Sequence, residues 1–228
     1  MSEIVTPRNL EEAMLALKSR ANTTVRERNI RDGSSDNQFG LTTTDIRNIA
    51  KSIKSYHELG LELWGTGNID AMMLASLIMK PKLFTEQELE QMAASVTFYH
   101  VADYFMTNVI KLHPGKESLR QRWMESSDIM LMRAGWSLTT ERVIKSPAGL
   151  DLGGLLDRIE RELATTPYLA QWTMNYSLAE IGIKFPECRE RALAIGEKLG
   201  VYRDWKVSKG CTSPFAPIWI GAMVARQK

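Results

Sequence analysis

Asp103 is a single carboxylate in a helical stretch of mostly apolar residues, 99–110. Tyr99 precedes it by four residues, and this spacing places both side chains on one face of a helix, one turn apart. Because burying a charge is costly unless the charge is paired, two roles are open for Asp103. It either pairs structurally with a basic residue such as Arg133, or holds its charge for chemistry in an apolar, aromatic setting.

Arg133 is likewise the only charged residue between 129 and 138. Its planar guanidinium can donate two parallel hydrogen bonds, which suits a carboxylate or a phosphate group. Farther along the chain, Trp172, Asn175 and Tyr176 give another helix a polar and aromatic face that either binds a ligand or packs in the core. If neighbouring helices stack, Arg133 is expected to approach Asp103 and Tyr176.

Motifs of several enzyme classes are missing from the sequence. There is no glycine-rich phosphate loop, no Gly-x-Ser-x-Gly nucleophile elbow and no His-Glu-x-x-His zinc helix. The three histidines do not form a plausible ligand cluster, and the two cysteines, Cys188 and Cys211, are too few for a cysteine zinc site. We therefore expect no metal, no cofactor and two reduced thiols.

The composition is that of a folded globular protein, with 44% apolar and 25% charged residues. A net charge of +2 is too small to indicate a nucleic-acid partner, so such a role depends on where the 29 basic residues lie. No apolar run is long enough to span a bilayer, and the first residues lack the order of a signal peptide. We expect a cytoplasmic protein that is monomeric and does not bind membranes.

Apolar residues recur at helical spacing along nearly the whole chain, whereas strand patterns are scarce. Capping residues, prolines and glycines divide this pattern into segments. The expected helices are 9–21, 42–53, 57–64, 68–79, 85–96, 99–112, 116–124, 128–145, 150–163, 167–183, 187–199 and 213–226.

A weak internal echo supports a repeat protein. The letters GWSL at 135–138 return as NYSL at 175–178, a period of about 40 residues that is typical of HEAT-type helical pairs. We predict an all-α, HEAT-like solenoid of about five antiparallel helix pairs, with the first helix of each pair on a concave face. It forms a single domain with a lead-in at 1–40, repeats at 41–200, and a loop and capping helix at 201–228. An up-down bundle is the alternative, but it needs helices of similar length.

Six segments resemble the DNA alkylation repair proteins with HEAT-like repeats, the AlkD type, in their order and spacing. They are FGLTTTDIR (39–47), LELW (61–64), AMMLASL (71–77), YHVAD (99–103), RAGW (133–136) and NYSLAEIG (175–182). The resemblance implies a concave surface that binds double-stranded DNA. In active members it also implies hydrolysis of the N-glycosidic bond of cationic alkylpurines, without moving the damaged base into a pocket.

The resemblance also assigns roles to residues. Asp103 matches an aspartate that faces the damaged nucleotide, Tyr99 and Tyr176 stand where active members have two tryptophans, and Arg133 matches an arginine that contacts the phosphate backbone. Because an alkylated purine is already a cationic leaving group, a carboxylate that stabilises the developing sugar cation is the main requirement, and aromatic rings add cation–π attraction. Further candidates for DNA contact are Trp136, Trp172 and Asn175.

Two departures from the active pattern suggest a divergent branch with weakened DNA binding. Tyrosines replace both tryptophans, and the segment 32–37, where active members have a DNA-contacting helix, is rich in turn formers and carries two aspartates. In the C-terminal part, Lys206 and Lys209 before a helix expected to begin at Ser213 form a candidate anion site, or only a helix cap. Two functions stay open: an alkylpurine DNA glycosylase, or a non-catalytic module that binds DNA structures or a protein partner.

Overall fold

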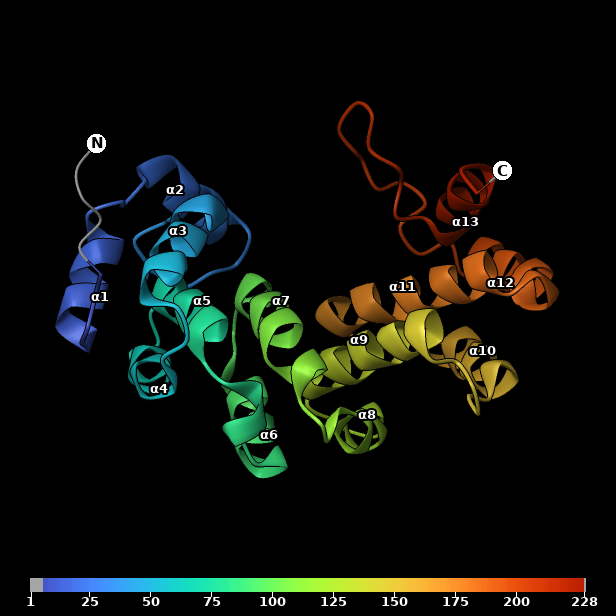
Figure 1. Cartoon of the computed structure of the whole chain (residues 1–228). Helices are drawn as coiled ribbons and strands as arrows, with labels where there is room; N and C mark the ends of the chain where they lie inside the picture. Colours follow the sequence, from blue (N-terminus) through green and yellow to red (C-terminus); the bar gives the residue numbers. More distant parts are fainter. Residues whose placement is uncertain (1–5, 228) are drawn as a thin grey trace. The chain divides into compact units, whose positions relative to one another are not determined.

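The computed structural model describes residues 6–227, which form thirteen α-helices, two short 3-10 helices and no strand (Figure 1). The all-α class is therefore as expected. The helices are α1 (Leu10–Lys18), α2 (Thr23–Arg31), α3 (Thr43–Ile53), α4 (His57–Gly65), α5 (Ile69–Ile78), α6 (Glu86–Ser95), α7 (Tyr99–Asn108), α8 (Lys116–Met124), α9 (Ile129–Lys145), α10 (Leu152–Glu162), α11 (Tyr168–Lys184), α12 (Pro186–Leu199) and α13 (Ala216–Ala225).

The chain divides after Lys116 into two compact units, unit 1 before this point and unit 2 after it. In unit 1, α3 packs on α5 and α5 packs on α7, with α4 against α5. In unit 2, α9 lies along α11, and α11 in turn contacts α12 and α13 (Figure 1). Within each unit, the first helices of successive predicted pairs are thus neighbours, so their apolar faces are buried against one another.

Capping side chains set the beginnings of most helices, as the sequence predicts. Thr85 and Glu88 form a complete capping box at α6, in which Thr85 N–H donates to Glu88 Oε2 at 2.7 Å. Gly200, in the left-handed conformation, ends α12. Side chains also accept first-turn N–H groups at Asn9, Thr42, Asn68, Asp128 and Asp151.

Two elements differ from the prediction. The helix α2 was not expected, because Val25 and Ile30 are its only apolar residues and no apolar stripe marks it. Asn22 caps this helix by accepting the Val25 N–H at 3.1 Å. The last helix begins at Ala216, with Pro217 in its first turn, and not at Ser213. Ser213 accepts the Phe215 N–H at 3.2 Å and so belongs to the preceding loop.

Asp70 fixes the irregular segment that follows α2. This side chain is 1% exposed, and its two oxygens accept three consecutive backbone N–H groups, from Phe39 (2.6 Å), Gly40 (3.0 Å) and Leu41 (2.9 Å). Gly40 has a φ of 81°, and a Cβ there would lie 2.5 Å from Asn22 O, so only glycine suits the position. The buried carboxylate thus anchors the start of α3 to α5.

In unit 2, α8 and α9 approach each other closely at Gly135. A Cβ at this position would lie 2.8 Å from Met124 N and 2.8 Å from the carbonyl carbon of Trp123, both of them backbone atoms. Backbone cannot move aside as a flexible side chain can, so the contact requires glycine.

We therefore expect Gly135→Ala to lower the free energy of unfolding by about 1–3 kcal/mol, the usual effect of overpacking. The matched control is Gly221→Ala in α13, where no described atom lies within 4 Å of the added Cβ. This control should be neutral or stabilising by up to about 1 kcal/mol, since alanine is the better helix former. Urea unfolding followed by circular dichroism measures both changes, and equal effects of the two substitutions would contradict the close approach.

A charge cluster also connects α8 to α9. Glu117 accepts hydrogen bonds from Arg120 Nε (2.9 Å) and Nη2 (2.8 Å), and Arg142 Nη1 lies 2.5 Å from its Oε1. The hydrogen bonds from Arg120, assisted by Arg142, lower the pKa of Glu117 to about 2. The native state thus holds this proton less tightly than the unfolded chain does.

The lowered pKa predicts how Glu117→Gln changes stability with pH. The stabilisation by the carboxylate is present above its ordinary pKa of 4.5 and is lost as the pH falls towards about 2. At pH 7 we expect the variant to be less stable by about 1 kcal/mol, a value that allows for solvent screening of a side chain that is 39% exposed. Urea unfolding at pH 7, 5 and 3 should show this difference shrinking. A difference that does not change with pH would contradict the ion pair.

Candidate nucleic-acid interface

Asp103 lies on the exposed side of α7 in unit 1. The buried residues of this helix are Val101, Phe105 and Met106, and Asp103 points away from them. The prediction that Asp103 carries a burial cost is therefore wrong, because an apolar composition did not reveal which side of the helix faces the core. Tyr99, one turn earlier, is half-buried, with its ring centroid 5.1 Å from that of Phe98 and 4.4 Å from that of His100.

Tyr176 lies on α11 in unit 2 and is half-buried. Its ring stacks on Trp219 of α13, with centroids 4.9 Å apart and planes inclined by 23°. Burial, followed by the nearby Glu180 carboxylate, raises the pKa of the Tyr176 hydroxyl, which hydrogen-bonds to Glu180. One face of this ring is thus covered by tryptophan. Asp103 belongs to the other unit, so the expected approach of Arg133 to both Asp103 and Tyr176 stays a prediction.

Arg133 is only 5% exposed. Its Nη1 donates to the Leu169 carbonyl oxygen in the first turn of α11 at 2.7 Å. This position differs from that of a typical phosphate contact, whose guanidinium reaches into solvent. In unit 2, Arg133 therefore connects α9 to the beginning of α11.

Trp136 and Asn175 are also internal, contrary to the DNA-contacting positions predicted for them. Trp136 is 1% exposed and belongs to the apolar core of unit 2. Asn175 is 2% exposed, and its Nδ2 donates to Pro214 O at 2.9 Å, which holds the chain just before α13. Trp136 of α9 thus packs in the core and Asn175 of α11 bonds to the loop before α13, so both side chains serve the fold.

Trp172 remains half-buried and is part of a group of rings that the sequence analysis did not identify. We call Tyr168, Trp172, Tyr202 and Trp205 the aromatic cluster. The side chains of Tyr168 and Trp205 are 55% and 44% exposed, and these two rings are stacked with centroids 6.3 Å apart. The i, i+4 spacing of Tyr168 and Trp172 indicates in the sequence that the two rings share a helix face. Their contact with Tyr202 and Trp205, in the loop after α12, has no such signal.

Lys206 and Lys209 are exposed on the loop that connects α12 to α13 and extends beyond the helices of unit 2 (Figure 1). The helix N-terminus expected beside them lies farther along the chain, at Ala216. The candidate anion site therefore depends on the two ammonium groups and not on a helix end. At the base of this loop, the Arg203 guanidinium lies 4.5 Å from the ring centroid of Phe215.

Three arginines just upstream of the irregular segment lie on a helix. Arg26, Arg28 and Arg31 lie on α2, immediately before the turn-rich residues 32–37. Arg28 and Arg31 are exposed, whereas Arg26 pairs with Asp36 at 3.1 Å. The expectation that residues 32–37 are not helical is correct, but these cations have a regular scaffold.

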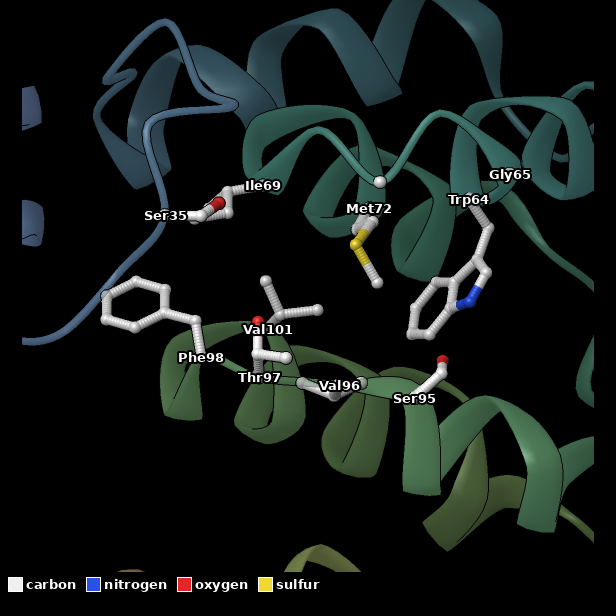
Figure 2. A pocket seen from close by; sticks show the side chains of 11 residues that line it. Ser35, Trp64, Gly65, Ile69, Met72, Ser95, Val96, Thr97, Phe98 and Val101 are labelled. Atoms are coloured by element: carbon white, nitrogen blue, oxygen red, sulfur yellow. The ribbon is translucent and has the colours of Figure 1, made fainter.

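A cavity of about 250 Å³ lies in unit 1 between residue 35, the α4–α5 turn and the α6–α7 turn (Figure 2). Trp64, Met72 and Phe98 form apolar walls, and Ser35 and Thr97 add hydroxyl groups. No charged residue belongs to the described lining, so the cavity offers a phosphate group no cationic partner.

Histidines, cysteines and carboxylates do not gather into a metal-binding group anywhere in residues 6–227. His113 is instead buried, with Nε2 3.0 Å from Phe84 O and Nδ1 accepting the Gly115 N–H. In the same part of the chain, no helix has both the length and the apolar character needed to cross a membrane.

Comparison with known proteins agrees with this architecture. A solved structure, from work on "a new family of proteins related to the HEAT-like repeat DNA glycosylases with affinity for branched DNA structures", is 25% identical and superposes with a TM-score of 0.81 over 96% of this chain and 95% of that chain. An uncharacterized protein of Listeria monocytogenes is 23% identical over 80% of this chain and 81% of its own. Another from Listeria innocua is 23% identical over 71% and 72%.

The fold is thus an all-helical, HEAT-like repeat of the kind found in DNA glycosylase relatives. Residues 10–206, from α1 to the loop that follows α12, match the sequence pattern of the family described as DNA alkylation repair enzyme. The chain belongs to the DNA alkylation repair enzyme family.

Proposed function

We propose that this protein binds branched double-stranded DNA, and that the loop between α12 and α13 contacts the phosphates. Membership of a DNA repair family and the affinity of the related protein for branched DNA support a DNA-binding function. The observation that carries the proposal is the exposure of Lys206 and Lys209, neither of which forms an ion pair within the described part of the chain.

A surface cation without an ion pair strengthens DNA binding, because its contact with a phosphate releases counterions condensed on the DNA. Two other exposed lysines of unit 2 are already partly neutralised, because Lys145 pairs with Glu141 and Lys198 pairs with Glu160. In unit 1, Arg28 and Arg31 on α2 provide a second pair of exposed cations. Contacts of this kind give affinity without base specificity, which suits recognition of DNA structure.

The double substitution Lys206→Ala/Lys209→Ala tests the contact. Each lost phosphate contact lowers the slope of log K against log salt by about 0.9, so the slope for a four-way DNA junction should fall by about 2. Fluorescence anisotropy of a labelled junction between 50 and 200 mM salt measures this slope.

The matched control is Lys145→Ala/Lys198→Ala, which removes the same charge from lysines that already pair with glutamates. We expect this control to leave the slope within about 0.5 of the wild-type value, since no phosphate contact is lost. If both double variants lower the slope equally, net charge and not the loop determines binding, and the proposed contact is wrong.

Excision of cationic alkylpurines is a second candidate function. The exposure of Asp103, with Tyr99 one turn away on α7, favours it, because a carboxylate must reach the sugar to stabilise a developing oxocarbenium ion. In this reaction the N-glycosidic bond breaks, the cationic alkylpurine leaves as a neutral base with both bonding electrons, and water adds to the sugar cation and releases a proton to solvent.

Asp103→Asn keeps the shape of the side chain and removes its charge. If the protein excises alkylpurines, the variant should release methylated purine from alkylated duplex about a hundred- to a thousandfold more slowly. Its melting temperature should change little, because the residue is exposed. Chromatography of released base and thermal unfolding measure the two effects. No release by the wild-type protein above the spontaneous rate removes this second candidate and leaves DNA binding.

A further inference from the structure

The aromatic cluster presents two large rings to solvent at one place on unit 2. Tyr168, the first residue of α11, and Trp205, in the loop after α12, are nearly parallel, with planes inclined by 22°. Trp172 and Tyr202 meet edge to face at 5.4 Å, and Tyr202 meets Trp205 at 5.6 Å. Contiguous exposed aromatic surface is uncommon on monomeric proteins and marks a binding site.

Tyr202 shows that the cluster is maintained against a local cost. Its φ is 62°, in the left-handed region that non-glycine residues rarely adopt. Its hydroxyl oxygen is buried without a hydrogen-bond partner among residues 6–227, and burial raises the pKa of this hydroxyl. Strain and an unsatisfied polar atom together are typical of positions kept for function.

The charges around the cluster select an anionic ligand. Lys206 and Lys209 follow Tyr202 in the same loop, against a single carboxylate at Asp204. Arg203 already pairs with Glu197 at 2.8 Å, so the two lysines are the cations that remain for a ligand. Aromatic rings beside cations are the combination by which proteins hold single-stranded nucleotides, since bases stack on the rings and the cations neutralise phosphates.

We propose that the aromatic cluster is a stacking site for an unpaired base at a DNA branch point. Bases inside a duplex are already stacked on both faces, whereas a branch point can present a base with a free face. Trp205 and Tyr168 provide the exposed rings, and Lys206 lies next to Trp205 in the chain. This inference rests on the proposed DNA-binding function and specifies the part of the DNA that it recognises.

A forked DNA with one 2-aminopurine in its single-stranded arm tests the stacking, because the fluorescence of this base falls when it stacks. We expect Trp205→Leu/Tyr168→Leu to restore emission in the saturated complex and to weaken fork binding roughly 5- to 100-fold. Affinity for a fully paired duplex of the same sequence should stay unchanged. The salt slope for the fork should also stay unchanged, because the lysines remain.

Two controls separate stacking from a structural effect. Trp205→Phe keeps a ring and should retain most of the quenching and affinity. Tyr56→Ala removes a tyrosine of similar exposure, 40%, in unit 1 and should change neither. Circular dichroism and thermal unfolding establish that each variant is folded.

The outcomes distinguish this inference from the function on which it rests. Fork binding by the wild-type protein with 2-aminopurine emission equal to that of the leucine variant overturns the stacking site and leaves the proposed function standing. Equal loss of fork and duplex binding in the leucine variant, without rescue by Trp205→Phe, shows a structural role and also overturns it. If the wild-type protein binds no DNA, both proposals are wrong.

Discussion

A buried guanidinium holds the beginning of α11, and the candidate interface of unit 2 depends on it. Pro167 at the N-cap of α11 provides no side-chain hydrogen bond within the described residues, so this helix lacks the usual means of fixing its first turn. Arg133 of α9 donates to the Leu169 carbonyl in that turn, a bond that ties the start of α11 to α9 and does not cap its N–H groups. Tyr168 and Trp172 flank this point, so the same contact that joins two helices also places the aromatic rings.

Unit 1 has a comparable device in Asp70, whose carboxylate accepts three backbone N–H groups of a loop 30 residues away. Asp70 and Arg133 are both buried charges that bond to backbone atoms, and each is the only charged residue in an apolar stretch, 69–78 and 129–138. Removing such a partner leaves buried polar groups unsatisfied, which costs more than the hydrogen bonds contribute. Asp103 looks similar in the sequence but lies on the exposed side of α7.

The helices could be predicted because their limits are local. Asn68, Thr85 and Asp128 begin helices through bonds to residues two or three positions away. The positions of side chains were harder, because composition does not tell which side of a helix is covered. Trp136 was thus expected at the surface but is in the core, and the aromatic cluster was missed because Tyr202 and Trp205 reach α11 across more than 25 residues of chain.

We propose that this family member recognises DNA structure through cations and rings on unit 2. Competition between an unlabelled forked DNA with a single-stranded arm and an unlabelled, fully paired duplex, for protein bound to a labelled fork at about 150 mM salt, tests this most directly. We predict that the fork competes at about tenfold lower concentration, the effect of stacking one unpaired base at about 1.4 kcal/mol. Equal competition by fork and duplex would contradict the proposal.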